Sequence, residues 1–286
     1  MAERDRGGED PWDLSRLEEP GPTHGELFRQ SRGRVPDPRT DPRAERGRSP
    51  LLAGVLVVGL LLTVVFAQDP AGATARLHDL VRGGDRLAVA VEPEDGPGVF
   101  AFVRTQRGSE DPVTWSPCDP IRYVVNPDGA PDGWEDLVFD AVTTVEEASG
   151  FRFDDEGTTD DRDFDRRGSG LSPKPVLIGW SDEEETPGLA GSVAGLGGAA
   201  WQRRSVGREW FTTGMVVLDT DVYDRLEGER RGADAMRGIL VHELGHVVGL
   251  DHVDDPRELM YGGELRRTTL GAGDKQGLAA LGGVSC

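Results

Sequence analysis

The sequence predicts a compact α/β domain from about residue 111 onward, preceded by one transmembrane helix. Three observations predict this arrangement. Short runs rich in β-branched and aromatic residues, bounded by turn residues, recur between residues 121 and 219. Longer segments repeat apolar residues at helical spacing. One run of 17 residues near the N-terminus is apolar and uncharged, which is typical of a membrane span.

The first part of the chain divides into two segments. Residues 1–50 are rich in Arg, Asp, Glu, Pro and Gly without apolar periodicity, which predicts a disordered cytoplasmic segment. Residues 51–67 read LLAGVLVVGLLLTVVFA, close to the lower length limit of about 17 residues for a transmembrane helix. Four arginines stand between residues 39 and 48, whereas the first charge after the run is Asp69. The positive-inside rule therefore places the N-terminus in the cytoplasm and the rest outside the cell.

Cleavage of this segment is the alternative. Val65-Phe66-Ala67 offers a site that a signal peptidase could cut, which would release a secreted protein beginning after Ala67. The charged leader of about 50 residues is long for a signal peptide, so an uncleaved anchor is favoured.

Residues 68–110 are interpreted as a juxtamembrane stalk or a small prelude to the main domain, with two possible strands at Arg86–Val91 and Val99–Thr105. Residues 111–286 are predicted to form the main domain. Its predicted strands are Ile121–Val125, a short one starting at Phe151–Phe153, Pro175–Trp180, an edge strand within Leu189–Trp201, and Gly214–Asp219. Its predicted helices run from a cap at Asp132 to about Ala148, from about Ala233 to Val248, and near Ala272–Leu281, and Asp154–Arg167 is expected to be a charged loop.

Composition limits the partners of this protein. The net charge is −20, and nucleic-acid binding needs a basic face instead, so no nucleic-acid partner is expected. The two cysteines, Cys118 and Cys286, both follow the hydrophobic run. If that part is exported, one disulfide between them is favoured over two free thiols.

One motif carries the chemistry: His242-Glu243-x-x-His246-x-x-Gly249-x-x-His252. Residues four apart lie on one helix face, so His242 and His246 can bind one ion together. Glu243 is adjacent and can reach a water at that ion. Gly249 allows the helix to end, since glycine adopts a left-handed conformation without a Cβ clash, and the chain can turn back to present His252.

The same helix has a predicted buried side. Met236, Leu240, Leu244 and Val247 form an apolar stripe about 200° around the helix from the two histidines. We therefore expect one face to pack on the domain and the other to face a cleft.

The segment HELGHVVGLDHVDDPRELMY resembles the matrixin branch of the metzincin zinc peptidases, in a bacterial, membrane-anchored form. The resemblance implies a twisted, mostly parallel five-stranded sheet with an active-site helix and a C-terminal helix. It implies that His242, His246 and His252 bind one catalytic Zn²⁺ and that Glu243 is the general base. Met260 would be the residue of the Met-turn. Tyr261 directly follows it, as in matrixins, and is not assigned as a ligand.

The resemblance implies a metalloendopeptidase that hydrolyses internal bonds of extracellular proteins, with the substrate extended beside the edge strand within Leu189–Ala200. The main alternative is a zinc-containing, membrane-anchored binding module without proteolytic activity. An interaction protein that works through residues 1–50, and zinc hydrolysis of a non-peptide bond, are further alternatives. Ca²⁺ is possible at Asp154–Asp165 or at the trio Asp219, Asp221 and Asp224, although acidic runs are more often solvated surfaces.

Overall fold

The computed structural model describes residues 85–167, 173–202, 208–263 and 266–286. The predicted cytoplasmic segment (1–50), membrane helix (51–67) and first part of the stalk lie outside these ranges. Within them, no helix combines the length and hydropathy that crossing a bilayer requires.

The central element is a five-stranded sheet with the strand order β3-β2-β4-β6-β5. The first four strands pair in parallel, and β5 joins the edge beside β6 in the antiparallel sense. The predicted mostly parallel five-stranded sheet is confirmed. The strands are β2 (Ile121–Asn126), β3 (Phe153–Thr158), β4 (Val176–Ser181), β5 (Gly195–Gln202) and β6 (Trp210–Asp219).

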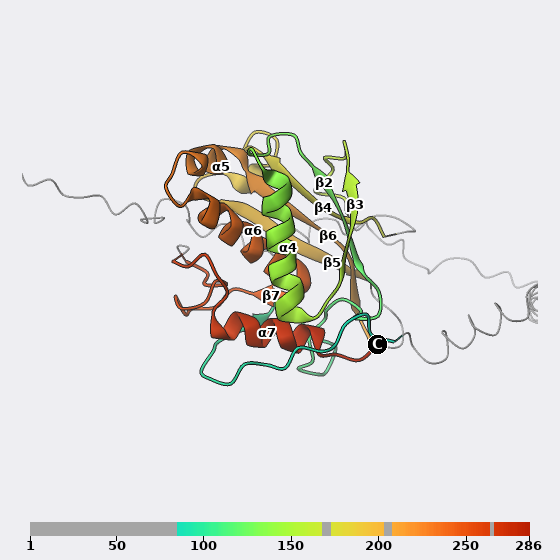
Figure 1. The fold of residues 1–286 in the computed structure, drawn as a ribbon. Helices are drawn as coiled ribbons and strands as arrows, with labels where there is room; N and C mark the ends of the chain where they lie inside the picture. The colour runs from blue at the N-terminus through green and yellow to red at the C-terminus, as the bar shows by residue number, and fades with distance from the viewer. Residues whose placement is uncertain (1–84, 168–172, 203–207, 264–265) are drawn as a thin grey trace, which may run out of the picture. The chain divides into compact units, whose positions relative to one another are not determined.

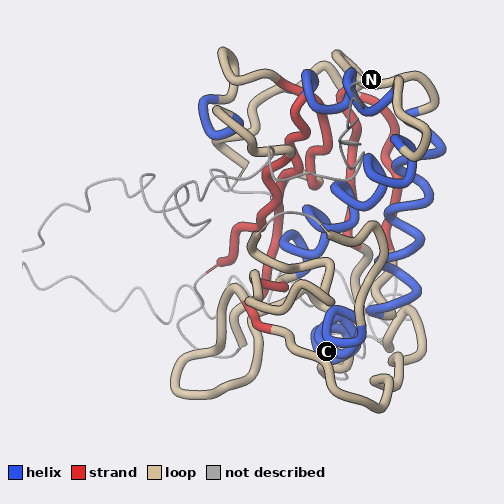
Figure 2. The backbone as a smooth tube through the Cα atoms, turned by 90° about the vertical axis from the view of Figure 1, so that its left-hand side faces the viewer, coloured by secondary structure: helices blue, strands red, loops and turns tan. Residues whose placement is uncertain are grey.

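The long helices lie together on one face of this sheet, so that sheet and helices form two layers (Figures 1 and 2). The main hydrophobic core fills the space between the layers, with side chains from the strands and from the helices. A smaller core on the other face joins Leu177, Leu196, Met215 and Val217 to Phe164 and Leu189 from the loops. The helices are α4 (Trp134–Ser149), α5 (Thr220–Glu227), α6 (Gly232–Val248) and α7 (Ala272–Gly282).

The helix α6 is more deeply buried than its apolar stripe predicts. Met236, Leu240, Leu244 and Val247 are buried as expected. Ile239, Val241 and both histidines of the helix are buried as well, because α4 packs on one side of α6 and β5 on another. The face of α6 that carries the histidines is therefore buried too, whereas the sequence led us to expect that it faces a cleft.

The segment before residue 111 packs against the domain. Residues Arg86–Ser285 group in one compact unit, so the described part of the predicted stalk contacts the main domain. Of the two strands predicted there, Arg86–Val91 is not a strand, and the second is reduced to β1 (Ala101–Phe102). β1 pairs with β7 (Leu250–Asp251), directly after α6. The Arg86 guanidinium donates to the carbonyls of Gly282 and Val284, which holds this segment to the end of α7.

Three local predictions need correction. Asp132 does not cap α4, because Gly133 occupies the N-cap and Asp132 N donates instead to Glu227. The expected charged loop begins later, since Asp154–Thr158 continues β3 as an exposed edge strand. The helix α5 was not expected, and the carboxylate of Asp219 caps it by accepting from Val222 N at 2.8 Å.

The predicted disulfide is present. Both cysteines, Cys118 and Cys286, are disulfide-bonded, and they are the only cysteines in the chain.

Candidate metal centre

The histidine motif has the local geometry that its spacing predicts. His242 and His246 lie one turn apart on α6, which ends at Gly249 with φ of 123°. A Cβ at Gly249 would lie 3.1 Å from the side chains of both Leu281 and Phe211, so glycine is needed here for space as well as for conformation. The chain then turns back through β7 and presents His252.

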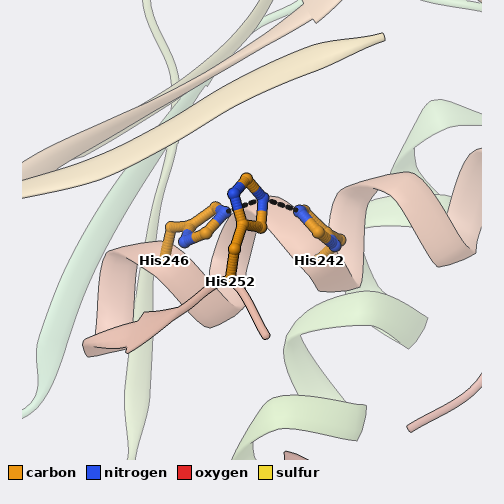
Figure 3. A group of neighbouring side chains, drawn as sticks. All are labelled: His242, His246 and His252. Atoms are coloured by element: carbon orange, nitrogen blue, oxygen red, sulfur yellow. Dashed lines mark hydrogen bonds between the residues drawn. The ribbon is translucent and has the colours of Figure 1, made fainter. Parts of the chain in front are cut away.

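The three imidazoles converge on one point (Figure 3). The Nε2 atom of His252 lies 3.1 Å from Nε2 of His242 and 3.1 Å from Nε2 of His246. Three nitrogens bound tetrahedrally to zinc at about 2.0–2.1 Å would lie about 3.3 Å apart. The separations of these ring nitrogens therefore fit one zinc ion.

Backbone carbonyls fix the tautomers of the two buried histidines. Nδ1 of His242 lies 2.8 Å from the carbonyl oxygen of Leu259, and Nδ1 of His246 lies 2.8 Å from that of Leu250. A carbonyl oxygen can only accept, so each Nδ1 carries the proton and each Nε2 turns a lone pair inward. His252 is exposed as a residue, but its ring nitrogen lies against the other two imidazoles, and this burial lowers its pKa. All three rings are thus suited to bind a cation as neutral ligands.

The Glu243 side chain lies between α6 and the edge strand β5. It is buried, at 5% exposure. A Cβ at Gly195 would approach Glu243 Cγ to 2.9 Å, and a Cβ at Gly197 would approach the Glu243 carbonyl oxygen to 2.2 Å. The glycines of β5 therefore allow the helix backbone and the carboxylate to lie directly against the strand.

Met260 lies against α6, with its sulfur 2.7 Å from where a Cβ at Gly245 would be. The turn around it is held by Asp274 of α7, which accepts from Leu259 N at 2.6 Å and Met260 N at 3.2 Å. The carbonyl of Leu259 orients His242, and the N–H of the same residue is bound by Asp274. Asp274 therefore contacts the site indirectly, through Leu259. Burial raises the pKa of Asp274, an effect that its backbone hydrogen bonds oppose.

The sequence did not single out Gly195, Gly197 or Asp274. Alternating glycines on an edge strand are a signal of close backbone approach, and this signal could have identified the first two. Asp274 gave no signal for this role, because the turn residues Leu259 and Met260 that it holds are 15 and 14 residues away along the chain.

The acidic stretches considered for calcium form no comparable cluster. Within the described ranges, His242, His246 and His252 are the only group of three or more potential ligands brought together. In the acidic loop, Asp161 faces Arg167 at 2.7 Å and Lys174 at 3.1 Å. Calcium binding gains no support from these contacts and stays a prediction.

The sheet, the helix α6 and the histidine cluster together define a zinc metallopeptidase domain of the metzincin type. A family model described as matrixin (Peptidase_M10) matches residues 134–281, just over half of the chain. The chain therefore belongs to the matrixin family. Among solved structures it is similar to archaemetzincin from Methanopyrus kandleri, with 18% identity over 56% of this chain and 93% of that one, and a TM-score of 0.38.

Proposed function

We propose that this protein is a zinc-dependent endopeptidase that cleaves internal peptide bonds of extracellular proteins. His242, His246 and His252 hold the zinc, and Glu243 is the general base. The observation that carries the proposal is the convergence of three imidazole nitrogens on one point. The rings of His242 and His246 are oriented by backbone carbonyls at their other nitrogen, and His252 is placed by the turn after α6.

The residues around this centre support hydrolysis. Bound zinc supplies Lewis acidity, which polarises a peptide carbonyl and lowers the pKa of water toward about 7. Glu243 follows the ligand His242 on α6 and is fixed against β5. Its carboxylate accepts a proton from the attacking water and then donates it to the leaving amine.

The edge strand β5 supports an extended peptide as substrate. Within the described part of the chain, β5 pairs only with β6, so its other edge can add a strand. The face of β5 at Gly195 and Gly197 packs on Glu243, so this strand lies beside the proposed base. A peptide paired there by main-chain hydrogen bonds would place one of its own bonds at the metal centre.

The location of the domain is proposed from the sequence. Residues 51–67 anchor the chain in the cell membrane with the N-terminus in the cytoplasm, which places the catalytic domain outside. The disulfide between Cys118 and Cys286 supports an oxidising compartment. Secretion after cleavage near Ala67 would lead to the same compartment.

The test compares the full chain with Glu243→Gln, which keeps the size of the side chain and removes the base. A library of unmodified peptides is digested, and the metal content of each sample is measured. We expect the variant to bind zinc as the parent does and to lose about 10²–10⁴-fold in kcat, the contribution typical of a general base. Equal cleavage by both proteins would refute the role of Glu243. Zinc binding without cleavage by the parent would favour the non-proteolytic binding module.

A further inference from the structure

The far end of β5 carries an aromatic ring stacked with a cation. Trp201 is one of the few large apolar side chains that stay exposed among the described residues, at 36%. The guanidinium carbon of Arg104 lies 4.0 Å from the centre of its ring. This distance is well inside the range of about 6 Å for cation–π contacts.

This pair lies on the same face of the sheet as Glu243. Gly195, which borders Glu243, pairs with Leu218, and Trp201 pairs with Phe211 across a bulge. Residues directly opposite in an antiparallel pair share a face. Leu218 and Phe211 both belong to the core beneath the helices, so Trp201 is on the α6 side.

The Arg104 side chain is held by a buried carboxylate. Its Nε and Nη2 atoms donate to Oε2 of Glu209 at 3.4 and 3.3 Å, and Glu209 is 4% exposed. Its Nη1 atom has no hydrogen-bond partner among the described residues. Arg107, whose side chain is 62% exposed, lies 3.6 Å from the other Glu209 oxygen. Two arginines therefore share one buried carboxylate, and each keeps guanidinium donors that this carboxylate does not use.

The chain as a whole has a net charge of −20, which repels acidic peptides at long range. A guanidinium fixed by a buried carboxylate, with donors left over, is suited to recognise another carboxylate.

The position of Trp201 along β5 gives its distance from the Glu243 site. Strands rise about 3.3 Å per residue, so Trp201 is roughly 13–20 Å beyond the Gly197–Gly195 segment that borders Glu243. A bound peptide covers that length with about four to six residues. If it pairs antiparallel to β5, which is the more stable pairing, the Trp201 end of the strand faces its N-terminal part.

We propose that Arg104, Arg107 and Trp201 form a distal substrate subsite that selects a Glu or Asp side chain about four to six residues N-terminal to the scissile bond. This inference rests on the proposed peptidase function, and it adds a class of substrate: extended segments with an acidic residue upstream of the cleavage point.

The test uses a peptide that the full-length protein cleaves, taken from the library digest. It is made in versions that carry Glu or Gln at the fourth, fifth or sixth position before the scissile bond, and in a matched set substituted after it. We expect kcat/KM for the best Glu peptide to exceed that for its Gln counterpart about fivefold, the upper range for a partly exposed ion pair. This ratio falls toward one in 0.5 M salt, because such pairs are screened.

Three variants locate the effect. Arg104→Gln and Arg107→Gln should each lower the Glu/Gln ratio, and the double variant should bring it to about one. Arg107→Gln removes an exposed side chain and should fold normally even if Arg104→Gln does not. The control is Arg122→Gln, an exposed arginine paired with Glu156 near the opposite edge of the sheet, which should leave the ratio unchanged.

A binding assay separates this inference from the peptidase function. Labelled Glu and Gln peptides are titrated into the Glu243→Ala chain, and fluorescence polarisation is measured. Preferential binding of the Glu peptide without cleavage by the parent would support the subsite and reject the peptidase. Cleavage without a Glu preference, a preference only after the scissile bond, or no binding of either peptide would overturn the subsite.

Discussion

The contact between β5 and Glu243 leads to a prediction about two neighbouring glycines. Gly195→Ala should reduce catalysis while the fold survives, whereas Gly197→Ala should reduce the stability of the fold itself. Neither glycine has a positive φ, so alanine is acceptable to the backbone at both positions. The two variants differ in what the new methyl group meets.

The distances set the size of each effect. At Gly195 the new Cβ would meet Cγ of Glu243 at 2.9 Å, and ordinary contact begins at 3.4 Å, so a side chain must shift by about 0.5 Å. At Gly197 it would meet the Glu243 carbonyl oxygen at 2.2 Å, so strand and helix backbones must separate by about 1.2 Å. Overpacking of this kind costs about 1–3 kcal/mol or more. A misplaced catalytic group costs up to about 10²-fold in rate.

The assay measures kcat, zinc content and the midpoint of urea unfolding for both variants. Gly195→Ala should retain zinc and lose about 10–100-fold in kcat, with an unfolding midpoint near that of the parent. Gly197→Ala should show a clearly lower midpoint. Gly228→Ala is the control, because Gly228 is exposed and its new Cβ would lie 3.8 Å from the carbonyl oxygen of Arg225, an ordinary contact. Full activity in Gly195→Ala would refute the placement of the Glu243 carboxylate against β5.

Three further predictions follow, two on Asp274 and one on the membrane segment. Asp274→Ala leaves the N–H groups of Leu259, Met260 and Gly271 without their acceptor. The variant should lower the free energy of unfolding by about 2–4 kcal/mol, measured by urea unfolding. It should also weaken zinc binding about tenfold, measured by competition with a chelator. Burial raises the pKa of Asp274 above 3.8, so the folded state binds this proton more tightly and stability falls as pH rises from 3.8 through the folded pKa. Asp274→Asn should remove this fall in stability with pH. If the variant and the parent show the same dependence of stability on pH, the raised pKa of Asp274 is contradicted. Deletion of residues 51–67 should move the protein from the membrane fraction to the soluble fraction, and recovery of both forms in the soluble fraction would contradict anchoring.

The sequence predicted the candidate metal centre because the relevant geometry is local. The four-residue spacing of His242 and His246 places them on one face of any α-helix, and Gly249 both ends the helix and permits the turn to His252. The strands β2, β4 and β6 were likewise visible as short apolar runs, whereas only the start of β3 was predicted. Predictions failed where local signals were weak: Asp132 was not the cap, Arg86–Val91 lacks a strand partner, and the polar residues of α5 hid a helix.

The sequence by itself thus predicted the candidate ligands and the candidate base, since these depend on residues within a few positions of one another, and it identified the class of fold. The tertiary structure alone decided that β5 lies at the sheet edge over Glu243, that Asp274 supports the turn before Tyr261, and that Arg104 stacks on Trp201. These contacts join residues far apart in the chain. They follow from how the sheet and helices pack, because no periodicity or local propensity encodes which distant surfaces will meet.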